Sequence, residues 1–266
     1  MLSDWGYGGS ETAGVARVVS AHGDYFHLVC NEREGEIIAR KKASAFRELP
    51  PPITGDFVEF DYNPHGESRI LSVKPRFSEL FRLDPSSSGY KAQVLAVNFD
   101  TLFFAVPSVD ARSEARLGRF LAIAEASGCL SRVVVLSTKS DLAGGASAAP
   151  ELPQPVKSIA VSSVTGDGLD AVREYVRPRA TVAFIGPSGA GKSSLVNALA
   201  GEEWMATGEI QEWSGKGRHT TTSRELVMLP CGAMALDTPG LREVGVFGED
   251  GFELKGRLGG THRYRR

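Results

Sequence analysis

The sequence predicts a small all-β barrel followed by a larger α/β unit, within a chain of 266 residues that suits two compact units. Three observations support this fold class. Short β-prone runs separated by turn residues fill the first quarter of the chain. Beyond a Pro-, Ser- and Gly-containing stretch, long apolar runs alternate with helical periodicity, as in a parallel sheet with crossover helices. A glycine-rich loop, GPSGAGKS, then lies between a predicted strand and a predicted helix.

Charge, apolar content and cysteine spacing exclude several classes of protein. The formal net charge of −2 argues against bulk electrostatic capture of nucleic acid. No apolar run approaches the length that spans a membrane, and the start has no signal-peptide pattern, so we expect a cytoplasmic protein with no membrane contact. The three cysteines have no CxxC spacing and are expected to be buried free thiols.

The first part of the chain is predicted to be a flexible Gly- and Ser-rich N-terminus at 1–13 and a barrel at 14–77. The five expected strands are VARVVSA, YFHLVC, EIIAR, DFVEFDY and RILSVKP, a number and spacing for which the OB-fold is one common form. These residues alone leave open whether the barrel is structural or binds RNA or a protein. Residues 78–92 are expected to form a linker.

The α/β unit is expected over 93–246. The run VLAVNFDTLFFAVPS predicts a strand covered on both faces, and RVVVLSTKSDL, VKSIAVSS and ATVAFIG predict further strands. In SEARLGRFLAIAEASG, helical spacing gathers apolar residues on one face, and Gly128 is the expected stop. The residues of that face are Leu117, Phe120, Leu121 and Ala124.

The loop GPSGAGKS matches GxxxxGK[ST], whose glycines let backbone N–H groups approach phosphate oxygens. The N-terminus of the following helix adds partial positive charge. Lys192 is expected to reach the β- and γ-phosphates, and the Ser193 hydroxyl to ligate Mg²⁺. The predicted binding residues here are Gly186, Pro187, Ser188, Gly189, Ala190, Gly191, Lys192, Ser193 and Ser194.

Two later segments are expected to complete the phosphate and metal site. DTPG follows an apolar strand, so Asp237 is expected to hold the Mg²⁺ hydration shell and the Gly240 N–H to meet the γ-phosphate. In GKGRHTTTSREL, Thr221 is the predicted Mg²⁺ ligand, with Thr220 as the neighbour that could take its place. The predicted Mg²⁺ ligands are therefore Ser193, Thr221 and Asp237.

The stretch TKSD indicates which base is bound. Asp141 can accept two hydrogen bonds from guanine N1–H and the exocyclic amine, donors that adenine lacks as a pair. The Lys139 stem is expected to pack over the base, Thr138 stands in the place usually held by Asn, and Ser140 completes the tetrad. In VSSVTGDGL, the backbone of Ser162 and Ser163 is expected to contact guanine O6. An ATP-dependent kinase would share the phosphate loop but would not need this tetrad.

The base-reading tetrad precedes the phosphate loop, the reverse of the order in Ras-like GTPases, which indicates a circular permutation of the same sheet. The succession of a barrel, TKxD, SSVTGxGL, GPSGAGKSSL, GRHTTT and DTPGLRE resembles the RsgA (YjeQ) family of ribosome small-subunit-dependent GTPases, over about residues 14–246. The resemblance implies an OB-fold that contacts rRNA. It also implies GTP hydrolysis with GTP/GDP and Mg²⁺ in late maturation of the small (30S) ribosomal subunit, stimulated by that subunit. We expect a monomer and no DNA partner.

The chain departs from the family after residue 246, where the resemblance would place a zinc-binding domain. Residues 247–266 are predicted to be a short basic tail with no Cys and with His262 as the single His, too few ligands for zinc. We therefore expect the zinc domain to be missing and no zinc site in this chain. The tail's cations either touch RNA phosphates or belong to a disordered end.

The catalytic group is the least determined part of the site. In Ras-like GTPases a Gln after DxxG orients the attacking water, and here that residue is Leu241. His219 is the candidate for this role beside Lys192 and Thr221, because an imidazole can hydrogen-bond a water; packing or capping is the alternative. Two other functions stay open: a GTP-dependent factor whose barrel binds a protein, and a chiefly non-catalytic GTP/GDP-regulated RNA-binding module.

Overall fold

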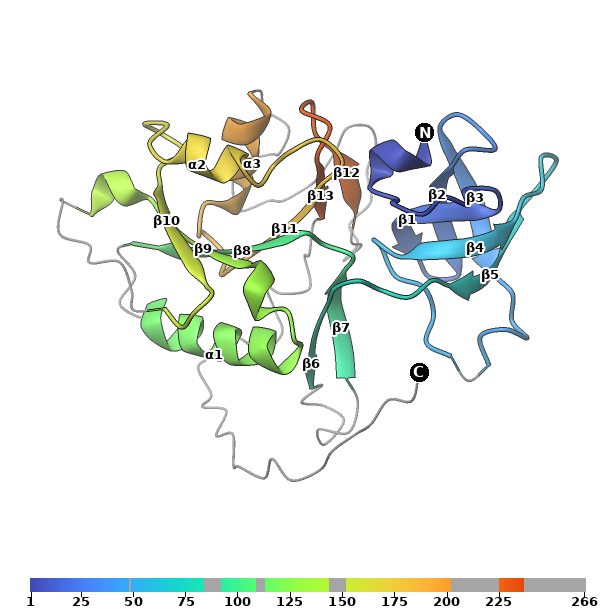
Figure 1. The fold of residues 1–266 in the computed structure, drawn as a ribbon, viewed down its shortest axis with the longest axis horizontal. Helices are drawn as coiled ribbons and strands as arrows, with labels where there is room; N and C mark the ends of the chain where they lie inside the picture. Colours follow the sequence, from blue (N-terminus) through green and yellow to red (C-terminus); the bar gives the residue numbers. More distant parts are fainter. Residues whose placement is uncertain (48, 84–91, 109–112, 144–151, 202–224, 237–266) are drawn as a thin grey trace.

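The computed structural model describes residues 1–47, 49–83, 92–108, 113–143, 152–201 and 225–236, and shows a barrel beside an α/β unit (Figure 1). The predicted fold class is confirmed. Several site residues predicted from the sequence lie outside these ranges, among them His219, Thr220, Thr221, Asp237 and Gly240.

The barrel closes in the strand order β1-β2-β3-β5-β4. Its strands are β1 (Val15–His22), β2 (Tyr25–Cys30), β3 (Glu36–Lys41), β4 (Phe57–Asp61) and β5 (Ser68–Val73). Neighbours are antiparallel except β3 and β5, which are parallel. Alternation places Ile37 and Ala39 of β3 in the core and Ile38 on the outside. A five-stranded barrel with this one parallel pair agrees with the expected OB-fold.

Two segments are more ordered than the sequence predicts. Residues Leu2–Trp5 form a 3₁₀ helix, η1, which buries Leu2 with 1% of its surface exposed. These residues are therefore ordered, although a flexible segment is expected at 1–13. Strands β6 (Glu79–Leu83) and β7 (Ala92–Val97) pair as a two-stranded antiparallel sheet, so residues 79–83 form a strand rather than a linker. In both places the order comes from partners distant in the sequence.

Six strands form the second sheet, in the order β10-β9-β8-β11-β13-β12. They are β8 (Thr101–Pro107), β9 (Val133–Thr138), β10 (Lys157–Val161), β11 (Thr181–Ile185), β12 (Leu226–Met228) and β13 (Met234–Leu236). All neighbours are parallel except β12 and β13. The run predicted as a single strand is split into β7 and β8 at Asn98, which has a φ of 51°. Because β9, β10 and β11 all run in the same direction, their carboxyl ends meet at one edge of the sheet.

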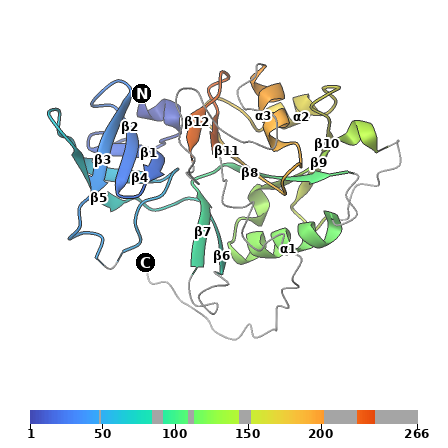
Figure 2. The same cartoon turned by 180° about the vertical axis from the view of Figure 1, so that it is seen from behind.

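Helices cover both faces of this sheet (Figures 1 and 2). They are α1 (Ser113–Ala126), α2 (Leu169–Arg173) and α3 (Lys192–Ala200), with 3₁₀ turns η3 (Leu130–Arg132) and η4 (Ser140–Leu142). Phe104 stacks on Phe120 of α1 at 4.1 Å between ring centres, whereas Phe103 packs in the core that includes Leu195 of α3. Successive strand residues thus fill opposite cores.

None of the helices in the described part of the chain is long and apolar enough to cross a lipid bilayer. Cys30 and Cys129 are buried free thiols, as expected. Cys231 is exposed, so the expectation of burial is wrong for this residue, which lies in the turn between β12 and β13.

Candidate nucleotide-binding site

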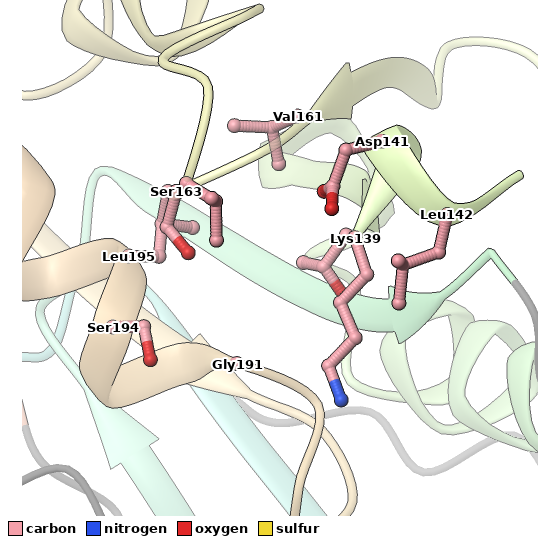
Figure 3. Close-up of a pocket in the computed structure, with 10 residues that line it drawn as sticks. Lys139, Asp141, Leu142, Val161, Ser163, Gly191, Ser194 and Leu195 are labelled. Atoms are coloured by element: carbon pink, nitrogen blue, oxygen red, sulfur yellow. The ribbon is translucent and has the colours of Figure 1, made fainter.

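Three loops at the carboxyl ends of β9, β10 and β11 surround a pocket of about 320 Å³ (Figure 3). The residues that line it are Thr138, Lys139, Asp141, Leu142, Val161, Ser163, Val164, Gly191, Ser194 and Leu195. They come from the TKSD stretch, the SSVTG stretch, the glycine-rich loop and the residues directly beside these segments. The structure therefore brings together three segments that are separate in the sequence.

The glycine-rich loop has the backbone that its glycines predict. Gly186 follows β11 with a φ of 151°, and a Cβ there would lie 2.4 Å from the carbonyl oxygen of Ala105 in β8. Gly189 and Gly191 adopt φ values of 73° and 82°, and Gly191 is the N-cap of α3. Because these conformations favour glycine, the loop turns sharply and directs the start of α3 toward the pocket.

Lys192 is the first residue of α3, and its side chain folds back onto the glycine-rich loop. Its Nζ donates hydrogen bonds to the carbonyl oxygens of Gly186 at 2.8 Å and of Pro187 at 2.7 Å. The ammonium is thus held against the loop on which phosphates are expected. Ser193 follows in the first turn of α3, where its hydroxyl is suited to a hard cation.

Thr138 connects the base-reading stretch to the phosphate loop. Its Oγ1 donates a 2.8 Å hydrogen bond to the carbonyl oxygen of Ala190, and both residues are buried. Its own carbonyl accepts bonds of 2.9 Å from the N–H and the hydroxyl of Ser108. The sequence predicts that Thr138 belongs to the tetrad but not which residue it contacts. In the structure that residue is Ala190, which lies 52 positions further along the chain.

Lys139 and Asp141 of the tetrad line the pocket, whereas Ser140 does not, and the chain enters this turn through a residue in the left-handed conformation. Lys139 has a φ of 57°, and η4 follows at once with Ser140 and Asp141. Figure 3 shows the Asp141 carboxylate facing the pocket, with the Lys139 stem along one side and Ser163 across from it. A carboxylate acceptor and an aliphatic wall therefore converge where a flat base could lie.

The two predicted serines have different places. Ser163 lines the pocket, but Ser162 is fully buried and its Oγ accepts the N–H groups of Val164 and Thr165, both at 3.2 Å. The Ser162 N–H donates to the carbonyl of Asp167 at 3.0 Å. Ser162 thus shapes the loop, and Ser163 is the serine that can meet a ligand.

One of the three predicted Mg²⁺ ligands lies within the described residues. Ser193 is described, whereas Thr221 and Asp237 lie outside the described residues. Among the residues that are described, no group of three His, Cys, Asp or Glu side chains is arranged to hold a metal ion. The donors expected for Mg²⁺, a hydroxyl and a carboxylate oxygen, are nevertheless the types that this cation prefers.

The fold and the pocket define a P-loop nucleotide-binding protein with a preceding barrel, in which the base-reading stretch comes before the phosphate loop. The sequence model of the RsgA GTPase family matches residues 73–247, which is more than half of the chain. The chain belongs to this family.

Curated relatives agree with that assignment. Small ribosomal subunit biogenesis GTPase RsgA 2 of Lactiplantibacillus plantarum is 35% identical over 237 residues, covering 88% of this chain and 67% of the relative. RsgA of Opitutus terrae is 44% identical over 212 residues, covering 75% of this chain and 57% of the relative.

Solved structures show the same fold at lower identity. YjeQ from Thermotoga maritima has a TM-score of 0.60 at 22% identity, covering 86% of this chain and 75% of that chain. YloQ, described as a circularly permuted GTPase, has a TM-score of 0.54 at 19% identity, covering 87% and 72%. The circular permutation predicted from the motif order is therefore the architecture of this chain.

Proposed function

We propose that this chain binds GTP in the described pocket, hydrolyses it to GDP and phosphate, and acts in the biogenesis of the small ribosomal subunit. The observation that carries the proposal is the hydrogen bond from Thr138 to Ala190, because it joins a base-reading stretch and a phosphate loop into one pocket. The relatives' names and the family supply the ribosomal context.

Each loop has a separate part in binding. Asp141 would accept the guanine N1–H and amine, and the Ser163 backbone would contact O6, since both residues line the pocket. The loop from Gly186 to Ser194 holds the phosphates through its N–H groups and Lys192. Mg²⁺ would neutralise charge on the phosphates, with Ser193, Thr221 and Asp237 as the residues that would hold it. Gly240, Thr221 and His219 are proposed to act at the γ-phosphate.

Displacement of fluorescently labelled GDP by unlabelled nucleotides tests the binding. We expect GTP and GDP to compete and ATP to compete poorly, since ATP leaves the Asp141 carboxylate without its paired donors. Asp141→Asn should lose this preference for guanine nucleotides. Asp170→Asn on α2 is the matched control for that variant, because the Asp170 carboxylate is 98% exposed and does not line the pocket. Equal competition by ATP and GTP would contradict the assignment of Asp141.

The outer face of the barrel supports a contact with rRNA. Tyr25 is 41% exposed, and the guanidinium carbon of Arg40 lies 4.2 Å from its ring centre. Arg69 is exposed on β5 directly beside Arg40 in the strand pairing. Arg40 is held by an ion pair with Glu67 at 3.0 Å and lies over the Tyr25 ring. The groups this face offers to RNA are therefore the exposed part of the Tyr25 ring, which can stack on an unpaired base, and the Arg69 guanidinium, which can contact a phosphate. We propose a cytoplasmic monomer whose partner is the small subunit rather than DNA.

Co-sedimentation with purified small subunits tests the barrel's part. Arg69→Glu is expected to reduce binding, because it places a carboxylate where a phosphate would lie. Arg173→Glu on α2, whose side chain is 49% exposed, serves as the charge-matched control on the other unit. Equal loss in both variants would point to net charge rather than to the barrel face.

A further inference from the structure

Strand β1 of the barrel is attached to the edge of the second sheet. Ser20 forms an antiparallel bridge with Glu225, the residue before β12. Within the barrel, β1 pairs with β4 over Val15, Ala16 and Arg17, so the later part of β1 has an edge for this bridge. Figures 1 and 2 both show β1 and β12 at the boundary between the two units.

Arg17, on the same strand, lies between the barrel and the second sheet, and its side chain is fully buried there. One terminal nitrogen contacts the Trp5 carbonyl and lies 3.2 Å from the Met234 sulfur of β13, and the other donates to the Asn98 carbonyl at 3.1 Å. The guanidinium carbon lies 4.7 Å from the ring centre of Phe57. One residue of the barrel thus touches η1, the loop before β8 and strand β13.

This arrangement is costly for a group that serves stability alone. Burial lowers the pKa of Arg17 to about 9, although the nearby Asp100 and Asp56 carboxylates raise it. Among the described residues, the buried Nε of Arg17 has no hydrogen-bond partner. An apolar side chain of similar volume often stabilises such a position as well or better. The guanidinium therefore points to a role in fixing how the two units meet.

The contacts of Arg17 lead directly to the nucleotide site. Met234 of β13 pairs with Thr181 of β11, and β11 runs into Gly186 of the phosphate loop. The Thr181 N–H also donates a 2.8 Å hydrogen bond to the Asp100 carboxylate. The barrel is therefore bonded to β13, and β13 is paired to the strand that carries the phosphate loop.

We propose that Arg17 is a positioning residue that couples the barrel to the phosphate loop through β13 and β11. Nucleotide in the loop tightens the docking of β1 on the β12–β13 edge, and docking in turn raises nucleotide affinity by the same factor, as linkage requires. The inference rests on the proposed function in that a guanine nucleotide occupies the loop.

A reversible disulfide measures the docking. Ser20→Cys with Glu225→Cys places thiols on directly paired residues, at a spacing that suits a disulfide, in a Cys231→Ser background. The fraction oxidised in defined glutathione buffers is measured with and without GDP or a non-hydrolysable GTP analogue. We expect nucleotide to raise the disulfide equilibrium constant at least about fivefold.

The control pair is Glu59→Cys with Ser72→Cys, which pair across β4 and β5 inside the barrel. Its equilibrium is expected to stay the same on adding nucleotide. A shift of equal size in both pairs, or in neither, overturns the coupling. Failure of the Ser20–Glu225 disulfide to form under any buffer overturns the docking geometry itself.

Arg17→Met in the same background tests the residue. We expect this variant to bind nucleotide and to lose the nucleotide effect on the disulfide, because Met fills the space without reaching the carbonyls. If nucleotide still shifts the disulfide equilibrium in this variant, the role of Arg17 is overturned. If the variant does not fold, the Ser20→Cys, Glu225→Cys protein that keeps Arg17 still decides whether nucleotide binding and docking are coupled. Nucleotide binding without a disulfide shift overturns this inference and leaves the proposed function standing. Absence of nucleotide binding in the unsubstituted chain overturns both.

Discussion

Replacing Gly186 by Ala tests whether close packing of β11 against β8 sets the position of the phosphate loop. The added Cβ would lie 2.4 Å from the Ala105 carbonyl oxygen, below the 3.0 Å that real Cβ atoms respect. The two backbones must therefore separate by at least about 0.6 Å, the difference between these distances. A misplacement near 1 Å in a catalytic site can cost about 10²-fold in reaction rate, and we apply the same scale to nucleotide binding by the displaced loop. We expect guanine nucleotide affinity to fall by about 10- to 100-fold.

Gly189→Ala is the matched control in the same loop. Gly189 has a φ of 73° but nothing within 4 Å of the added Cβ, so its cost is backbone strain alone, about 1–2 kcal/mol. That strain should lower the Tm by about 2–8 °C, and it should lower nucleotide affinity less than Gly186→Ala does. The assay is titration of labelled GDP together with thermal unfolding of each variant. Equal loss of affinity in the two variants, or full affinity in Gly186→Ala, would refute the packing argument.

Other substitutions test individual contacts of the site and of the fold. Asp141→Asn should weaken GTP binding and favour xanthine nucleotide, measured by competition; an unchanged GTP preference would remove this residue from base recognition. Thr138→Val leaves a buried carbonyl of the phosphate loop without its donor and should cost about 1–3 kcal/mol in unfolding free energy, which denaturant titration detects; no change would deny the contact a role. His219→Ala should retain GTP affinity and lose most of the rate stimulated by small subunits; full stimulation would place the water-positioning group elsewhere. A thiol reagent at neutral pH should label Cys231 in the native chain and three thiols after unfolding, since burial raises the pKa of Cys129 to about 11; labelling of all three in the native chain would contradict this.

The sheets and the pocket loops were predictable because their signals are local. Short β-prone runs between turn residues marked the barrel strands, and buried apolar runs marked the parallel strands. Each site loop carried its own motif directly after a strand, so the topology alone brings the loops to one edge. The circular permutation followed from motif order without any knowledge of contacts.

Contacts between distant segments could not be predicted in this way. Arg17 lies in VARVVSA, where a charge between apolar residues indicates an exposed position, yet β13 and η1 cover it. The bond from Thr138 to Ala190 needs two loops to meet, and the tetrad motif specifies only one of them. The Pro- and Ser-containing segment indicated a linker because pairing of β6 with β7 leaves no periodic signal in five residues.

GTP hydrolysis by this chain, measured with and without purified small ribosomal subunits, decides whether the chain is a GTPase that the small subunit stimulates. We expect slow hydrolysis by the chain alone, because Leu241 follows DTPG in place of a water-orienting Gln. We expect small subunits to accelerate hydrolysis at least about tenfold and large subunits not to accelerate it. A rate that small subunits leave unchanged would contradict this expectation.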